Sequence, residues 1–385
     1  MSFEIEIEGI EELEEKPEEI NPDFTDYRPD LERINEAAEE HSRENLILIG
    51  NGGSVTSFRA LLYTFMPEVK GNVRIVTTME PDYLHRISKE MQPENTVVMP
   101  ISKSGSTAGV IESLLFFMEQ DYPVFAVTSD NGGALRQIVE REDLPWIEHP
   151  EVGGRFSGAT ETGLTPAAFV GLDVDEIRAG ADEMYGKMKG GENPAAHLAS
   201  ALYNAEKNGY DQILNPVYST RLLGFQPLFI QLMHETVCKK GEGMTVYGDL
   251  GPEYQHHTNQ RLFGGKKDVV PLFMKAETHE KREIEVPENL KDIELRERSL
   301  GDLHGTELSH SLESEYRGVK EALEDEDMPH VTLNFTELSY RAAGELIAFL
   351  QYLAVYSANL RGVNPFNQPD VEKSKEIGFR KRFSE

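Results

Sequence analysis

The chain is poor in cysteine and in basic residues, and it lacks long apolar runs. Of its 385 residues only Cys238 is a cysteine, so an intramolecular disulfide and a cysteine-built metal centre are both excluded. The 38 Lys and Arg residues face 68 Asp and Glu residues, and the net charge of −30 repels nucleic acid and anionic lipid. Neither a membrane span nor a signal peptide is recognisable. We therefore expect a cytoplasmic protein without a nucleic-acid or membrane partner.

The acidic residues are spread from Glu4 to Glu385 and do not form a single tail. Such a surface is typical of halophilic proteins from high-salt cytoplasm, although an ordinary acidic mesophilic protein would also have it. With 39% hydrophobic and 28% charged residues, the composition is that of a folded globular protein.

Short apolar runs recur along the first half of the chain about every 25 residues, at 46–50, 73–77, 96–100 and 124–128. Helix-like periodicity separates them, which predicts a β-α-β-α unit with a doubly wound parallel sheet. A second α/β unit follows, with helices at 195–207, 223–239 and 338–360 and strands at 244–247, 269–273 and 330–333. Residues 276–328 are charged and weakly periodic, and we expect a peripheral helical insert there.

The fold class is therefore α/β, with two doubly wound α/β/α sandwich subdomains and a C-terminal helical tail. A helix is expected at 174–188, before the Gly-rich boundary at 189–193. The predicted organisation has four parts: an acidic, solvated lead-in (1–44), a first α/β domain (45–190), a second α/β domain (191–362) and a tail (363–385).

Two polar loops follow neighbouring strands of the first predicted sheet. The first, at 50–54, is Gly-Asn-Gly-Gly-Ser and ends in Ser54, while the second, at 102–107, is Ser-Lys-Ser-Gly-Ser-Thr. Hydroxyls, backbone amides and a helix N-terminus together can bind a phosphate, and ligands of open α/β sheets bind at the carboxyl edge. Each loop alone could be an ordinary turn or helix cap. No G-x-G-x-x-G spacing and no Walker loop is present, which disfavours a nucleotide site.

The two loops resemble the phosphosugar-binding core of sugar isomerase (SIS) domains, and further segments narrow the resemblance to the glucose-6-phosphate isomerase family. Residues 152–157 (Val-Gly-Gly-Arg-Phe-Ser) resemble the first signature of that family, and residues 366–375 resemble its second signature. Between them, Gln231 and Glu235 resemble the pair that contains the catalytic base, and Gln255-His256 resembles the stretch with the ring-opening histidine. The resemblance covers roughly residues 45–375.

This resemblance implies roles for individual residues. Glu235 would be the base that moves a proton between adjacent carbons, and Arg155 would stabilise the enediolate. His256 would exchange a proton with the ring oxygen, with Lys375 assisting at the C1 hydroxyl. The implied substrate-binding residues are Ser54, Ser102, Lys103, Ser104, Thr107, Gly154, Gln231 and Gln368. The resemblance also implies a homodimer in which the histidine reaches the partner's site, and a reaction without metal or cofactor.

Each role has a simpler alternative. Glu235 could be a solvent-facing helix residue, and Arg155 could pair with a surface acid. The His256-His257 pair could be part of a metal site, although adjacent histidines rarely bind one ion. Lys375 could belong to a disordered basic tail. At the level of function, the alternatives are a bifunctional phosphoglucose/phosphomannose isomerase and a sugar-phosphate regulator that binds without reacting.

Overall fold

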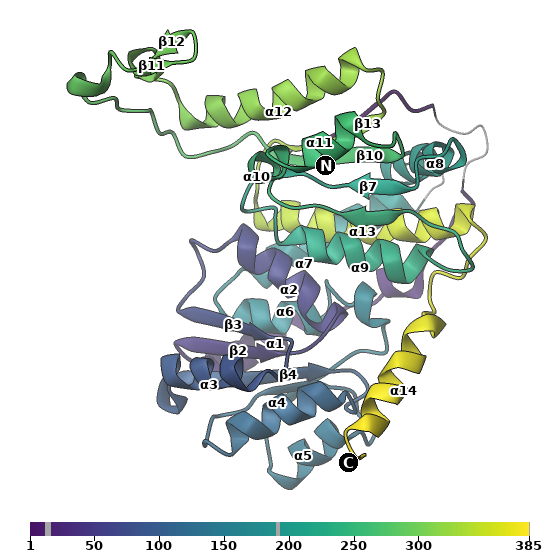
Figure 1. The fold of residues 1–385 in the computed structure, drawn as a ribbon. Coiled ribbons are helices and arrows are strands. Elements are labelled where there is room, and N and C mark those ends of the chain that lie inside the picture. Colours follow the sequence, from purple (N-terminus) through teal and green to yellow (C-terminus); the bar gives the residue numbers. More distant parts are fainter. Residues whose placement is uncertain (12–16, 190–192, 385) are drawn as a thin grey trace.

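The structure, a computed structural model, describes residues 1–11, 17–189 and 193–384. It consists of two sheets, each with helices on both of its faces, stacked one above the other (Figure 1). The predicted α/β class with two parallel-rich sheets is confirmed. Within the described ranges, no helix combines the length and the apolar character needed to cross a membrane.

The first sheet has five parallel strands in the order β3-β2-β4-β5-β6. Its strands are β2 (Asn45–Ile49), β3 (Asn72–Val76), β4 (Thr96–Ser102), β5 (Ala126–Thr128) and β6 (Trp146–Glu148). The helices of this unit are α1 (Leu31–His41), α2 (Gly53–Thr64), α3 (Pro81–Glu90), α4 (Ala108–Met118), α5 (Ala134–Arg141) and α6 (Glu161–Phe169). All four predicted strands are present, and β6, a strand of three residues, was not predicted.

Burial on both faces explains why the strands of this sheet are continuous apolar runs. All five residues of β2 are buried. Leu46 and Leu48 point into the core that the two units share, whereas Ile47 and Ile49 point into a separate core under α3, α4 and α5. Because successive side chains of a strand point to opposite faces of the sheet, one apolar segment contributes residues to the cores on both faces.

The second sheet runs in the order β1-β13-β10-β7-β9, with β8 also paired to β10. Its strands are β1 (Phe3–Glu8), β7 (Gln212–Leu214), β8 (Val217–Tyr218), β9 (Thr245–Tyr247), β10 (Val269–Ala276) and β13 (His330–Phe335). The main helices are α7 (Val174–Met188), α8 (Pro194–Lys207), α9 (Phe225–Val237) and α13 (Tyr340–Leu360), with the shorter α10 (Gly251–Gln255) and α11 (Thr258–Gly264). Every pairing in this sheet is parallel except that of β1 with β13.

The expectation that the first 44 residues form a solvated lead-in is wrong for β1. Phe3 is only 2% exposed and its ring packs against Phe335 and Phe349. The N-terminal segment thus adds an antiparallel edge strand to the second sheet, although all of the strand's ladder partners lie more than 320 residues away in sequence. The predicted boundary at 189–193 falls mostly outside the described residues, and the domain limits stay a prediction.

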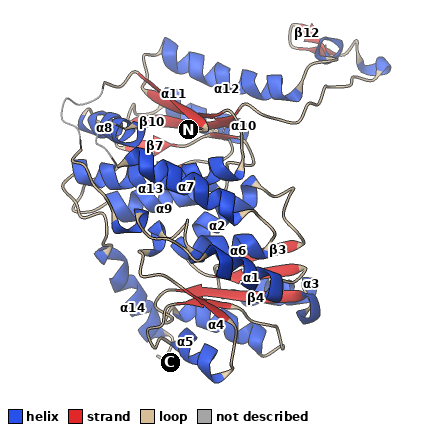
Figure 2. Cartoon of the chain, turned by 180° about the vertical axis from the view of Figure 1, so that it is seen from behind, coloured by secondary structure: helices blue, strands red, loops and turns tan. Residues whose placement is uncertain are grey.

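Helix α13 lies in the layer between the two sheets, where nearly all of its residues are buried (Figure 2). It packs against α7, α8 and α9, and α9 in turn packs against α2 of the first unit. The loop before α2 and the polar face of α9 are therefore neighbours. This contact between units positions the site described below.

The segment at 276–328 is peripheral, as expected. It contains a short hairpin of β11 (Glu294–Leu295) and β12 (Arg298–Ser299), which projects from the body, and α12 (Leu308–Asp325), which covers the outer face of the second sheet (Figure 1). At the C-terminus, α14 (Glu372–Lys381) runs down beside the first unit. There Arg382 forms an ion pair with Glu112 of α4 at 2.7 Å.

Candidate active site

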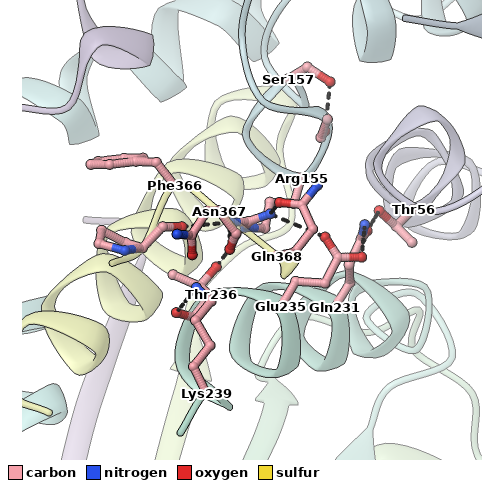
Figure 3. A network of polar contacts seen from close by, with 12 residues as sticks. Thr56, Arg155, Ser157, Gln231, Glu235, Thr236, Lys239, Phe366, Asn367 and Gln368 are labelled. Carbon is pink, nitrogen blue, oxygen red and sulfur yellow. Dashed lines mark hydrogen bonds and ion pairs between the residues drawn. The ribbon is translucent and has the colours of Figure 1, made fainter. Parts of the chain in front are cut away.

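Arg155 lies at the centre of a polar network between the two units (Figure 3). It belongs to a single 3-10 turn, Gly154–Phe156, and its side chain is 2% exposed. The guanidinium donates from Nε to Oγ1 of Thr236 at 2.9 Å and from Nη1 to Oε2 of Glu235 at 3.3 Å. Burial lowers the pKa of Arg155, and the Glu235 carboxylate opposes that shift. The contact fixes the direction of the Glu235 side chain on α9.

The same guanidinium also binds the segment that precedes α14. Nη1 donates to Oε1 of Gln368 at 2.6 Å, while Nη2 donates to the carbonyl oxygens of Pro365 and Asn367 at 2.6 and 3.2 Å. Arg155 therefore joins three parts of the chain that are distant in sequence. Only an arginine has enough donors in a planar arrangement to do this while keeping its charge.

Glu235 is held from its other side by its own helix. Gln231, one turn earlier on α9, donates from Nε2 to Oε1 of Glu235 at 3.1 Å, and Thr56 of α2 donates to Oε1 of Gln231 at 2.8 Å. The glutamate side chain remains 30% exposed. Each carboxylate oxygen thus has one protein donor, and part of the group faces solvent, as proton exchange with a bound ligand requires.

The glycine turn before α2 permits the close approach of this loop to Arg155. A Cβ atom on Gly53 would lie 2.0 Å from the carbonyl oxygen of Gly154, and Gly52 has φ +57° beside the Gln231 amide. Ser54 follows in the first turn of α2 and is half-buried. The predicted substrate-binding residues Ser54 and Gly154 therefore lie on two loops in direct contact.

The second polar loop leads from β4 into α4. The hydroxyls of Ser102 and Thr107 are 3.2 Å apart and share a hydrogen bond, and Ser104 Oγ accepts from the amide of Ser106 at 3.2 Å. Lys103 pairs with Glu151 at 3.1 Å, and its carbonyl accepts from Asn131. These hydroxyls at the amino end of a helix are suited to binding an anion.

A cavity of about 850 Å³ borders Arg155 on the side of the N-terminal segment. Lys103, Gly153, Arg155 and Phe366 contribute to its lining, together with residues 20–24, 26 and 27. Glu235 does not line it. Lys103 represents the Ser-rich loop in this lining, which includes none of Ser102, Ser104 and Thr107, so the cavity borders Arg155 without containing the predicted base or the predicted phosphate-binding hydroxyls.

Two predicted catalytic residues are not brought into this network. His256 is exposed at the end of α10, and none of its hydrogen bonds or ion pairs within the described ranges involves Arg155 or Glu235. The Lys375 side chain is 63% exposed on α14 and pairs with Glu372 at 2.9 Å. Their roles stay predictions, as do those of the other site residues.

Three polar residues of the network were not singled out from the sequence: Thr56, Thr236 and Lys239. Lys239 Nζ donates to the carbonyl oxygens of Thr236 and Asn364 at 2.7 and 2.6 Å. The sequence signal that could have identified Lys239 is its spacing, because it follows Glu235 by one helical turn just beyond the end of α9. That spacing says nothing about the partner at Asn364, which is 125 residues away.

Comparison with known proteins agrees with this architecture. No family model matches the chain. A glucose-6-phosphate isomerase of Rubrobacter xylanophilus is 30% identical over 358 residues, covering 87% of this chain and 82% of the relative. A solved structure of a hypothetical protein from Thermus thermophilus has a TM-score of 0.86 at 29% identity, covering 94% of this chain and 89% of that one.

A glucose-6-phosphate isomerase from Chlamydia trachomatis has the same SIS-like fold, with a TM-score of 0.72 at 22% identity over 90% of this chain and 72% of that one. The predicted resemblance is thereby confirmed at the level of fold and family. From the extent of the match to the Rubrobacter relative, the chain belongs to the glucose-6-phosphate isomerase family.

Proposed function

We propose that this chain interconverts D-glucose 6-phosphate and D-fructose 6-phosphate through a cis-enediol intermediate, a step of glycolysis and gluconeogenesis. The observation that carries the proposal is the Arg155–Glu235–Gln231 arrangement, in which a partly exposed carboxylate is held between an arginine and an amide. The relatives of this chain that are named glucose-6-phosphate isomerases support the choice of substrate.

Isomerisation moves one proton between C1 and C2 and moves hydroxyl protons with it. Glu235 takes the proton from C2 of the open aldose and returns it to C1, so a single carboxylate serves both carbons. As the enediolate forms, negative charge develops on the neighbouring oxygens, and the fixed positive charge of Arg155 stabilises it. The arginine does not have to move for this, because three segments already hold it.

The Ser-rich loop at 102–107 would bind the phosphate, away from the reacting carbons. Binding energy from a remote phosphate positions the sugar for proton transfer. His256 and Lys375 complete the proposal as the ring-opening acid–base pair. In this chain His256 is exposed directly after α10, and this exposure supports a dimer in which it reaches the partner's site.

The test is fructose 6-phosphate turnover on wild type and Glu235→Gln, coupled to glucose-6-phosphate dehydrogenase, with EDTA present and salt varied. Loss of a general base lowers kcat by about 10²–10⁴-fold, while binding of the sugar phosphate survives. Glu119→Gln, an exposed residue at the end of α4, is the matched control and keeps full activity. The coupling enzyme is checked separately at each salt concentration.

Deuterium transfer distinguishes the enediol mechanism from other routes. In D₂O, a carboxylate that exchanges its proton with solvent leaves deuterium on C1 or C2 of the product. Turnover without any incorporation would contradict exchange of the transferred proton with solvent at the partly exposed Glu235 carboxylate. Absence of turnover at every salt concentration, with binding intact, would place the protein among sugar-phosphate regulators.

A further inference from the structure

A second polar cluster lies on the far side of the second sheet, between β1, β13 and α12. In β1, Phe3, Ile5 and Ile7 alternate with Glu4, Glu6 and Glu8, so the glutamates share one face of the strand. Glu8 stands opposite His330 and Glu6 opposite Thr332 in the ladder. Helix α12 covers the same face, where the hydroxyls of Tyr316 and Thr332 are 2.8 Å apart.

His330 turns its Nε2 nitrogen towards this cluster. Its Nδ1 lies 3.0 Å from the carbonyl oxygen of Met328, which can only accept, so Nδ1 carries the proton in the neutral ring. The remaining nitrogen, Nε2, is buried and finds no hydrogen-bond partner among the described residues. It lies 3.8 Å from Oε2 of Glu8. Glu8 is 39% exposed, so only the histidine is buried, and its unpartnered Nε2 can act as a ligand for a cation beside the Glu8 carboxylate.

The charges around His330 do not balance. Lys320 Nζ binds Glu6 at 2.9 Å and Glu8 at 2.7 Å and lies 4.0 Å from Glu324. The three carboxylates, whose side chains are 39–45% exposed, outnumber this ammonium, so the cluster attracts cations. Glu324 closes the cluster, since its carboxylate, that of Glu8 and the His330 ring place one ligand atom each within 4.8 Å of one another.

We propose that Glu8, Glu324 and His330 form a binding site for a divalent transition-metal ion of the zinc type. Zinc binds imidazole nitrogen and carboxylate oxygen at about 2.0–2.2 Å, so two ligand atoms 3.8 Å apart can bind the same ion. The exposed Glu324 contributes the third ligand atom, which lies within 4.8 Å of the other two. Lys320 keeps its ion pairs with Glu6 and with Oε1 of Glu8.

The donor set favours zinc-like ions over calcium and magnesium, because a buried imidazole is a poor ligand for those harder ions. The Met328 carbonyl holds the ring orientation, as outer partners of ligating histidines commonly do. The ion would join the N-terminal edge strand to α12 and β13. Since α9 packs into the core on the opposite face of this sheet, the site is separate from Arg155.

The experiment uses the full-length chain without an affinity tag, stripped of metal with EDTA and then dialysed. Titration with Co²⁺, followed by its visible d–d absorption, reports the coordination directly, and Zn²⁺ binding is measured by calorimetry. We expect one ion per chain, and a rise in the melting temperature of about 3 °C at a hundredfold excess of Zn²⁺ over its dissociation constant.

The variants separate this site from other metal-binding residues. Glu324→Gln and His330→Gln weaken binding at least about tenfold, whereas Asp325→Asn, the exposed neighbour on α12, leaves it unchanged. Glu324 is exposed, so its substitution preserves the fold even if that of His330 does not. Lys320→Met tightens binding about tenfold, because the competing ammonium is removed.

Three outcomes would overturn the proposal. One is the absence of Zn²⁺ binding below 1 mM in the wild type. Another is unchanged affinity in Glu324→Gln. The third is binding that disappears in His257→Asn, which would assign the ion to the adjacent surface histidines instead.

Discussion

Lys239 is a buried residue that holds two segments of the site together. It is 8% exposed, and its ammonium group joins the end of α9 to the segment that carries Gln368. Burial, assisted by the positive charge of Arg155, lowers the pKa of Lys239 to about 8 from an ordinary value of 10.5. An unfolded chain has no such burial and keeps the ordinary value.

This difference predicts a pH dependence of stability. Between pH 8 and 10.5 the unfolded chain binds more protons at Lys239 than the folded chain does, so the free energy of unfolding rises with pH in this window. In Lys239→Met the rise is lost. Urea unfolding of both proteins at several pH values from 7.5 to 10.5 measures the difference, with the exposed Lys89→Met as control. A difference that stays constant with pH would contradict the assignment.

At the scale of elements, long periodic segments were predicted well, whereas short strands were predicted unevenly: β5 and β9, of three residues each, lie within predicted strands, but β6 was missed. The expected helix at 174–188 is α7 residue for residue, and the strand at 96–100 lies within β4. In contrast, β7 and β8 have three and two residues and were not predicted. A long helix or a buried strand shows a hydrophobic pattern in its own sequence. A two-residue strand shows no such pattern, because it is defined only by hydrogen bonds to a neighbouring strand.

The loop before α2 contacts the turn that carries Arg155 so closely that adding one methyl group at Gly53 is expected to disturb both. Gly53→Ala would place its Cβ against the Gly154 carbonyl, and the backbone on one side must shift. We expect kcat/KM to fall about 10–100-fold and stability to fall by about 1–3 kcal/mol. Steady-state kinetics and urea unfolding measure the two effects.

The matched control is Gly186→Ala on α7, where an added Cβ meets nothing within 4 Å. In a helix interior this change stabilises the protein by about 1 kcal/mol and leaves activity unchanged. Equal activity of the two variants would show that the close approach of the loops does not matter for turnover.

At the scale of the whole molecule, the site lies where two sheets and their helices meet. Arg155 comes from the first unit, Glu235 from α9 of the second, and Gln368 from the segment after α13. His256 stays outside this network within the chain. The predicted homodimer would supply it from the partner, and the acidic surface, with its net charge of −30, would face solvent around the assembly.

Complementation tests the dimer. Glu235→Gln and His256→Asn are each expected to be inactive. If each site combines Glu235 of one subunit with His256 of the other, a mixed dimer has one intact site. Unfolding and refolding an equal mixture of the two variants then restores about a quarter of wild-type activity. No recovery, with mixed dimers demonstrated by mass spectrometry, would show that each site is built from one chain.

The sequence by itself determined the α/β class, the two polar loops and the family to which the chain belongs, since these depend on local periodicity and on short motifs. Tertiary structure decided where β1 goes, because an alternating segment such as residues 3–8 can join any sheet edge that offers a matching face. It also decided the partners of Arg155 and Lys239. Those partners include the backbone carbonyls of Asn364, Pro365 and Asn367, and every residue has such a carbonyl, so only folding determines which of them meets a buried cation.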